Sequence, residues 1–161
     1  MSMFDNITSE EAFAHAAKLL ERNPNGTLRT TSVNYDAVKA FTLAMGQPVG
    51  EDIIKERDLL KMRTKLIEEE TKEAVQETLW EDALGNPQID KAELTKELAD
   101  LLYVVYGMAV TFGLPIDEVF VRVHRSNMSK LGDDGKPIYR EDGKVLKGPN
   151  YQPPDLTDLF E

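Results

Sequence analysis

Cysteine is absent from this 161-residue sequence, which excludes disulfide bonds, thiolate catalysis and cysteine-ligated zinc sites together. The sequence also has no apolar stretch of membrane length, and its start is polar rather than typical of a signal peptide. We therefore expect a cytoplasmic protein without a membrane partner. Only two histidines occur, His15 and His124, and neither stands in the Glu-x-x-His motif that di-iron helical bundles require. We expect a helix-surface position for His15 and a structural role for His124, although His124 could also meet a phosphate.

Several motifs of known chemistry are missing as well. There is no GxxxxGK phosphate loop, GxGxxG dinucleotide motif, HExxH zinc motif or GxSxG nucleophile elbow. Basic residues are outnumbered, with 19 Lys and Arg against 29 Asp and Glu, which leaves a net charge of −10. Since nucleic-acid binding depends on neutralising phosphates with Lys and Arg, nucleic acid is not an expected partner. The 41% of hydrophobic residues is enough for the core of one domain.

Acidic residues are concentrated in two otherwise apolar helical stretches. The first contains Glu69, Glu70 and Glu73, and the second contains Glu97 and Asp100. An α-helix turns by about 100° per residue, which places Glu70 and Glu73 on the apolar stripe of the first stretch. Buried carboxylates are costly unless a cation neutralises them, and oxygen ligands alone suit Mg²⁺ or Mn²⁺ better than zinc or copper. The pattern predicts a site for two or more metal ions, although an acidic run taken alone is more often a solvated helix face.

The two stretches are separated by Gly85, Asn86 and Pro87, which break the helical pattern and predict a turn. The midpoint of Glu70 and Glu73 lies as far before Gly85 as the midpoint of the second acidic pair lies after it. In an antiparallel helical hairpin, the two acidic clusters would therefore face each other at one level.

These motifs resemble those of a known family. The pattern Glu69-Glu70-x-x-Glu73, a helical spacer and Glu97-x-x-Asp100 is similar to the EExxE/ExxD signature of the all-α nucleoside triphosphate pyrophosphatases, the MazG-like superfamily. The Asn-x-x-Lys pattern that begins at residue 127, with the sequence after it, resembles the tail of MazG-like proteins from bacteria and phages. The stretch VKAFTLAMGQPV resembles the first core helix of their dUTPase-like branch. The resemblance covers residues 35–156 and none of residues 1–33.

The resemblance implies Mg²⁺-dependent hydrolysis of a nucleoside triphosphate, preferably a deoxynucleotide, to the monophosphate and pyrophosphate, as in nucleotide-pool sanitation. Together with the inward carboxylates, it predicts four metal ligands: Glu70, Glu73, Glu97 and Asp100. Glu69, rotated by about 100° from Glu70, is the candidate to orient or deprotonate the attacking water. The dUTPase-like match favours a pyrimidine such as dUTP or dCTP. Phe41 and Trp80 could stack on the base, although such residues more often belong to a core or an interface.

Basic charge is concentrated near the C-terminus. From residue 122 to residue 147 there are seven Lys and Arg against four acidic residues, whereas the remainder of the chain carries twelve against twenty-five. A substrate with several phosphates would fit between the acidic site and this basic segment. Asn127 and Lys130 match the family pattern and are the main candidates for phosphate binding, with Lys144, Lys147 and Tyr151 as weaker ones. Any single lysine of an exposed loop could equally be solubilising.

The predicted fold is all-α: a helical bundle around a long antiparallel helix hairpin, with a small C-terminal β-hairpin. We expect helices over residues 9–22, 36–45, 52–84, 90–112 and 115–128. Asp142-Gly143 predicts a type I′ hairpin turn, and residues 151–161 an extended arm. We expect residues 1–33 to form an N-terminal helix and linker, and residues 34–161 to form the catalytic domain.

The helix expected over residues 90–112 is apolar around most of its circumference, so it should be largely buried. One small bundle does not cover such a helix, and we therefore expect a homodimer or homotetramer. A different class of function is also open, namely a non-catalytic metal-binding helical module that acts in a protein interaction or in regulation. Metal-dependent affinity for a nucleotide separates the two classes, because only the enzyme requires it.

Overall fold

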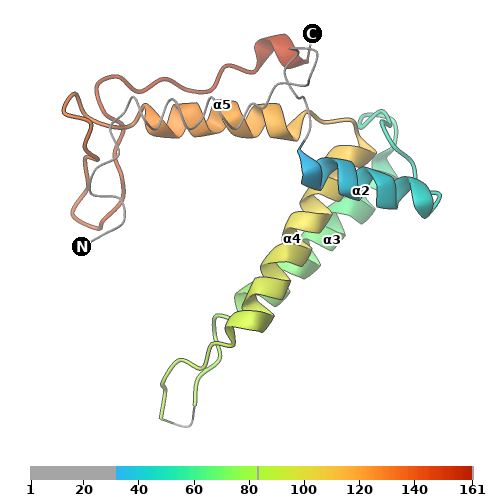
Figure 1. The fold of residues 1–161 in the computed structure, drawn as a ribbon, viewed down its shortest axis with the longest axis horizontal. Helices are drawn as coiled ribbons and strands as arrows, with labels where there is room; N and C mark the ends of the chain where they lie inside the picture. Colours follow the sequence, from blue (N-terminus) through green and yellow to red (C-terminus); the bar gives the residue numbers. More distant parts are fainter. Residues whose placement is uncertain (1–31, 83, 161) are drawn as a thin grey trace. The chain divides into compact units, whose positions relative to one another are not determined.

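The computed structural model describes residues 32–82 and 84–160 (Figure 1). This part of the chain forms four α-helices and one short 3-10 helix, without a β-strand. It divides into two compact units: Ser32–Leu114 is one, and residues 115–160 belong to the other. The predicted helical class is confirmed. The helix predicted over residues 9–22 lies outside the described residues, and the domain boundary predicted at residue 33 stays a prediction.

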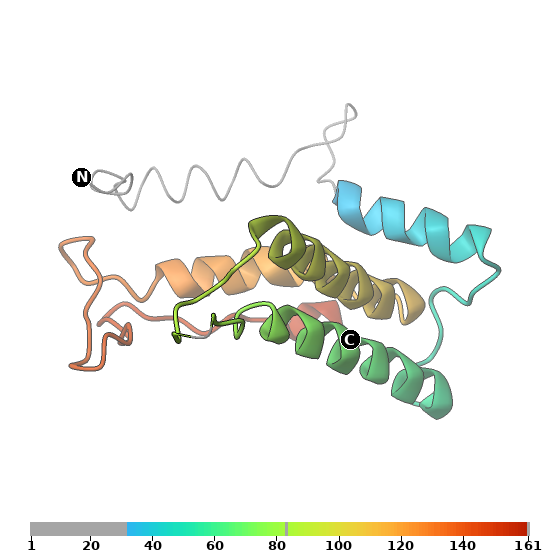
Figure 2. The same cartoon turned by 90° about the horizontal axis from the view of Figure 1, so that it is seen from below.

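Helices α3 (Arg57–Gln76) and α4 (Lys91–Thr111) form the centre of the first unit. They lie side by side and are joined at one end by residues 77–90 (Figures 1 and 2). The Asp90 carboxylate caps α4 by accepting hydrogen bonds from the backbone N–H groups of its first turn, and Gly113, with a φ of 62°, follows its end. The bounds of α4 agree with the predicted helix over residues 90–112.

Helix α3 is shorter than the helix predicted over residues 52–84. Before it, the Asp52 carboxylate accepts a hydrogen bond from the Ile54 N–H, and residues 52–56 close a separate turn. After it, the Asp82 carboxylate accepts hydrogen bonds from two backbone N–H groups of the turn that follows. Short acidic side chains that bond to nearby backbone in this way compete with helix formation. Because the hydrophobic pattern contains no information on such backbone bonds, the predicted bounds of this helix were wrong at both ends.

Helix α2 (Val33–Ala44) packs against α4. It begins after Ser32, whose hydroxyl accepts a hydrogen bond from the Tyr35 N–H at 3.2 Å. It ends before Gly46, which has a left-handed φ of 66°, a common way for a helix to stop. The buried residues of α2 are Tyr35, Val38 and Thr42.

Helix α4 is buried at its C-terminal end, where Ala109 and Val110 are at most 2% exposed. Farther toward its start, Leu98 is 48% and Leu102 is 56% exposed, beside an exposed Tyr103. The prediction that this helix is largely buried is therefore wrong for the single chain, because α2 and α3 cover only part of its circumference. Among the described helices, none is by itself long and apolar enough to cross a membrane, and only α4 and α5 (Ile116–Met128) taken together pass that test of length and composition.

The second unit is organised around α5. The tail after residue 148 runs beside this helix (Figure 1). Arg122 of α5 holds the tail by donating to the Asp155 carbonyl at 2.9 Å and to both carboxylate oxygens of Asp158. Ser129 accepts a hydrogen bond from the Gln152 N–H at 2.9 Å. The arm predicted over residues 151–161 is irregular as far as it is described, except for the 3-10 helix η1 (Thr157–Leu159) near its end.

The predicted C-terminal β-hairpin is reduced to one antiparallel bridge between Tyr139 and Val145, without a strand in the described part of the chain. Its turn is not type I′, because a type I′ turn needs positive φ at both central residues and only Gly143 has one, at 81°. Backbone hydrogen bonds from Arg140 to Lys144 and from Gly143 to Arg140 close a three-residue loop instead. A three-residue loop that ends in a left-handed glycine is the next most common hairpin connection.

Candidate functional site

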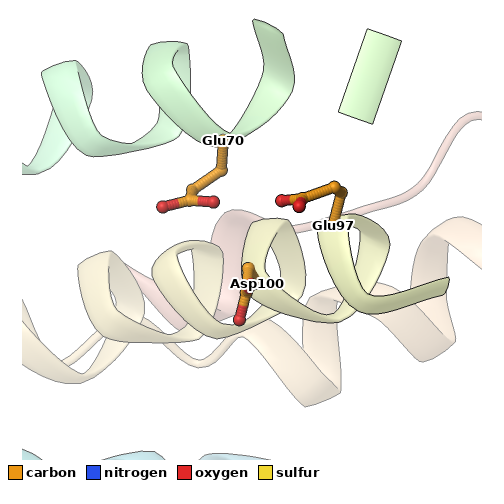
Figure 3. Close-up of side chains that lie close together, drawn as sticks. All are labelled: Glu70, Glu97 and Asp100. Atoms are coloured by element: carbon orange, nitrogen blue, oxygen red, sulfur yellow. The ribbon is translucent and has the colours of Figure 1, made fainter. Parts of the chain in front are cut away.

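Three carboxylates meet between α3 and α4 (Figure 3). Glu70 belongs to α3, and Glu97 and Asp100 belong to α4, three residues apart and therefore on neighbouring positions of one face. One carboxylate oxygen of each residue lies within 4.8 Å of an oxygen of each of the other two. We call these three residues the acidic cluster. They face one another across the two helices, whereas Glu73, which the equal spacing from Gly85 also placed at this level, is not a member of the group.

Glu97 is the most buried member of the acidic cluster. The residue is only 8% exposed, and its Oε2 atom is buried without a hydrogen-bond partner among the described residues. An unpartnered buried carboxylate oxygen costs free energy, which a bound cation would recover. The donor set consists of carboxylate oxygens alone, which hard divalent ions prefer. The acidic cluster therefore fits a divalent metal ion.

Lys96 supplies positive charge at the edge of the acidic cluster. Its Nζ atom donates to Glu97 Oε1 at 2.8 Å and to Asp100 Oδ2 at 3.0 Å. These two hydrogen bonds raise the pKa of Lys96 well above its ordinary value, so the side chain stays protonated. Lys96 is 59% exposed in its side chain, so it approaches the two carboxylates from the solvent side.

Glu70 is half-buried and carries a raised pKa. Desolvation is the largest cause, and repulsion by the carboxylates of Glu73, Asp100 and Glu97 adds to it, while Lys96 opposes the shift. The negative charge of Glu70 is thus held in an unfavourable place. A cation bound at the acidic cluster would relieve the same repulsion.

Glu73 and Glu69 lie outside the acidic cluster. Glu73 is exposed, although its charge acts on Glu70. It stands three residues before the end of α3, and the helical wheel, which carries no information on where the neighbouring helix ends, overestimated its burial. Glu69 is about half exposed and pairs with Lys65 at 3.6 Å. A ligand role for Glu73 and a catalytic role for Glu69 stay predictions.

Four of the five predicted phosphate-binding residues are linked to one another within the second unit. Lys130 donates to Asn127 Oδ1 at 2.7 Å, and Lys147 Nζ lies 4.2 Å from the centre of the Tyr151 ring. The positive charge of Lys130 also lowers the pKa of Tyr151, so the first pair interacts electrostatically with the second. We call these four residues the basic cluster. Lys144, the fifth, lies on the turn around Gly143, where its backbone N–H donates to Asp142.

Ser126, which sequence reasoning did not single out, supports the basic cluster from α5. The residue is 7% exposed, and its hydrogen bond with the Tyr151 side chain is the main cause of a lowered Tyr151 pKa, to which the positive charge of Lys147 adds. A small polar residue next to Asn127 carries no distinctive pattern, so no signal in the sequence could have identified it. Lys96 had a signal, namely its position four residues before Asp100 on the acidic face.

The two aromatic residues proposed for base binding lie apart. Phe41 of α2 contacts Tyr103 of α4 edge-to-face, with ring centres 5.6 Å apart. Tyr103 also lines a largely apolar cavity of about 240 Å³ between α2 and α4, together with Tyr106 and Asn34. Trp80 is 59% exposed on the connection between α3 and α4. His124 is half-buried on α5, and His15 lies outside the described residues.

The chain resembles known proteins in its central part. A family model described as phosphoribosyl-ATP pyrophosphohydrolase matches residues 38–127, which is more than half of the chain and includes both acidic stretches. An uncharacterised protein of Acanthamoeba polyphaga mimivirus is 30% identical over 121 residues, which are 72% of this chain and 43% of that protein, so the chain spans less than half of that relative's length. A crystal structure described as a candidate NTP pyrophosphohydrolase from Exiguobacterium sp. 255-15 is 26% identical with a TM-score of 0.38, over 76% of this chain and 89% of that one.

Proposed function

This chain belongs to the phosphoribosyl-ATP pyrophosphohydrolase family, and from that membership and the acidic cluster we propose that it hydrolyses a nucleoside triphosphate to the monophosphate and pyrophosphate. Mg²⁺ is the proposed cofactor, with Mn²⁺ as a substitute and two or more ions per site. The observation that carries the proposal is the buried Oε2 atom of Glu97, which has no partner in the described part of the chain although Glu70 and Asp100 present oxygens within 4.8 Å.

Glu70, Glu97 and Asp100 would hold the metal, with Glu73 as a further ligand whose charge already acts on Glu70. Ions bound there would draw charge from phosphate oxygens and make water more acidic. Glu69 would orient and deprotonate the attacking water, and the bond between the α and β phosphates would break. The weak, exposed contact of Glu69 with Lys65 at 3.6 Å leaves this carboxylate able to change partners.

The basic cluster would bind phosphate oxygens. Lys130 and Lys147 supply charge, and Asn127 and Tyr151 supply neutral donors that the two lysines and Ser126 already orient. Lys144 is a weaker candidate, because it lies outside this cluster on an exposed turn. The geometry within the second unit supports the assignment, since isolated solubilising lysines would not be linked to neutral donors in this way.

We propose a pyrimidine deoxynucleotide, dUTP or dCTP, as the substrate. The dUTPase-like character of the residues around Phe41 is the reason. The cavity beside Tyr103 supports it, because its largely apolar walls suit a planar ring and Asn34, one of its lining residues, would offer an amide to the polar edge of a base. Trp80 is the weaker candidate for base binding, because it lies on an exposed connection away from this cavity.

The exposed leucines of α4, Leu98 and Leu102, support the proposed homodimer or homotetramer. A monomeric mass by light scattering at micromolar concentration would contradict this part of the proposal. A cytoplasmic location and a role in nucleotide-pool sanitation complete it, and neither a nucleic acid nor a membrane is proposed as a partner.

Glu97→Gln provides the direct test. The substitution keeps the size of the side chain and removes a charge from the acidic cluster, so turnover of the preferred nucleotide should fall by at least about a hundredfold. Purified protein would be assayed with Mg²⁺ against a panel of canonical and modified NTPs and dNTPs. Glu68→Gln is the matched control, since Glu68 is exposed on α3 and contributes nothing to the acidic cluster. Metal binding without any metal-dependent nucleotide affinity would instead indicate a non-catalytic module.

A further inference from the structure

We propose that Lys96 is a substrate-contacting residue of this site and that its ammonium group binds a phosphate oxygen of the triphosphate while it remains next to Glu97 and Asp100. The inference rests on the proposed function, because it takes the acidic cluster as the metal-binding part of the site. It concerns a residue that no motif of the sequence assigns to the reaction.

The contacts of Lys96 leave one hydrogen-bond donor for a ligand. A lysine ammonium group has three N–H donors. Lys96 uses one on Glu97 Oε1 at 2.8 Å and one on Asp100 Oδ2 at 3.0 Å. The side chain is 59% exposed, so the remaining donor faces solvent rather than the protein interior. Lys96 is therefore fixed in position by two carboxylates and still open to an anion.

The position of Lys96 makes a phosphate the fitting anion. Glu97 and Asp100 belong to the acidic cluster, so an anion held there through a shared cation lies beside the same two carboxylates that fix Lys96. With Glu73 as the proposed fourth ligand, the carboxylates carry four negative charges, and one divalent ion together with Lys96 balances three of them. A second divalent ion makes the site positive, and a triphosphate supplies the compensating charge.

Two opposite effects follow from this arrangement. Lys96 and the metal attract the same two carboxylates, so loss of the lysine should strengthen metal binding in the absence of nucleotide. Loss of the lysine also removes a charged donor to phosphate, so it should weaken binding of the nucleotide in the presence of metal. If Lys96 only stabilised the helix surface, its loss would produce neither effect. If it only oriented the carboxylates, its loss would weaken metal binding.

Lys96→Met in the full chain tests the proposal by calorimetry. Mn²⁺ alone should bind about two- to fivefold more tightly than to the wild type, as expected for the loss of an exposed charge pair. A non-hydrolysable dUTP analogue with Mg²⁺ should bind about tenfold more weakly, as expected for the loss of a charge-assisted hydrogen bond. The Michaelis constant of the preferred nucleotide should rise by a similar factor, and Lys96→Arg should restore most of the nucleotide affinity.

Lys61→Met is the matched control. Like Lys96, Lys61 is an exposed lysine paired with a carboxylate, that of Asp58 at 2.9 Å, but it belongs to α3. It stands nine residues before Glu70, about 14 Å along the helix and beyond the Debye length of about 8 Å. It should change neither binding constant. Unchanged or tighter nucleotide binding by Lys96→Met would overturn the Lys96 inference alone. Absence of pyrophosphate release by the wild type would instead overturn the proposed function.

Discussion

Glu70→Gln should stabilise the metal-free protein and weaken its response to metal. In the folded chain the charge of Glu70 is opposed by desolvation and by the carboxylates of Glu73, Asp100 and Glu97, which together raise its pKa. Glutamine has nearly the same shape and no charge, so the substitution removes this repulsion with little change in packing. Loss of the Glu70 charge, although it belongs to the proposed metal site, should therefore increase the unfolding free energy of the metal-free protein.

The expected size follows from Coulomb's law. Two unit charges at 4.8 Å, the separation that bounds the oxygens of the acidic cluster, repel by about 0.9 kcal/mol in water and about 3.5 kcal/mol at an effective dielectric constant of 20. Glu70 is only half-buried, so solvent screens its charge and the repulsion lies near the value in water. The repulsions from Glu97 and Asp100, partly offset by the attraction to Lys96, sum to about 1 kcal/mol. Glu70→Gln should therefore raise the unfolding free energy of the metal-free protein by that amount, which corresponds to about 2–4 °C in Tm for a chain of this size.

Thermal unfolding in EDTA at pH 7 and low salt measures this difference. High salt should shrink it, because the Debye length falls to about 3 Å at 1 M. Mg²⁺ should reverse the order, since ligand stabilisation grows with affinity for the folded state and the wild type binds more tightly. Glu68→Gln, exposed on the same helix, should change neither value. A Glu70→Gln variant less stable than wild type in EDTA would refute the reasoning.

Three further expectations follow. Because the folded-state pKa of Glu70 is raised, the charged side chain destabilises the folded protein at neutral pH, and this effect disappears as the pH falls through the raised pKa toward 4.5. The difference in unfolding free energy between Glu70→Gln and wild type should therefore narrow over this pH range in EDTA, and a difference independent of pH would contradict the prediction. Arg122→Met should release the tail from α5, because it removes the bonds to Asp158, and limited proteolysis should then cut residues 150–160 faster than in the wild type. Gly148→Ala should destabilise the second unit by roughly 1–3 kcal/mol, since a Cβ atom would lie 2.6 Å from the Lys130 carbonyl oxygen; a wild-type urea midpoint would contradict this.

The sequence predicted the elements that local chemistry determines. Gly46 follows the end of α2, and Asp90 and Gly113 bound α4, because caps and left-handed glycines act within a few residues. The start of α2 was predicted three residues late, at residue 36, because the cap at Ser32 was not recognised. The spacing of the acidic residues about Gly85 predicted that carboxylates of α3 and α4 would lie across from each other, and three of the four do so. Glu73, the fourth, is not part of that group.

The wrong predictions concern the ends of α3 and the burial of single residues, because hydrophobic periodicity reports neither side-chain bonds to the local backbone nor the extent of neighbouring helices. Asp52 and Asp82 bond to local backbone and shorten α3 at both ends, although the apolar pattern continues. Glu73 lies on the same side of α3 as Glu70 by the helical wheel, yet it is exposed three residues before the end of the helix. Leu102 is exposed because α2 and α3 cover only part of α4, and the hydrophobic pattern of α4 does not show which part of a helix its neighbours cover.

The products of hydrolysis test the central claim most directly. Phosphorus-31 NMR of the wild-type protein with its preferred nucleotide and Mg²⁺ distinguishes pyrophosphate from inorganic phosphate during turnover. We predict equal amounts of nucleoside monophosphate and pyrophosphate, with no product in EDTA and almost none from Glu97→Gln. Release of nucleoside diphosphate and inorganic phosphate, or turnover that persists in EDTA, would contradict a metal-dependent pyrophosphohydrolase built on the acidic cluster.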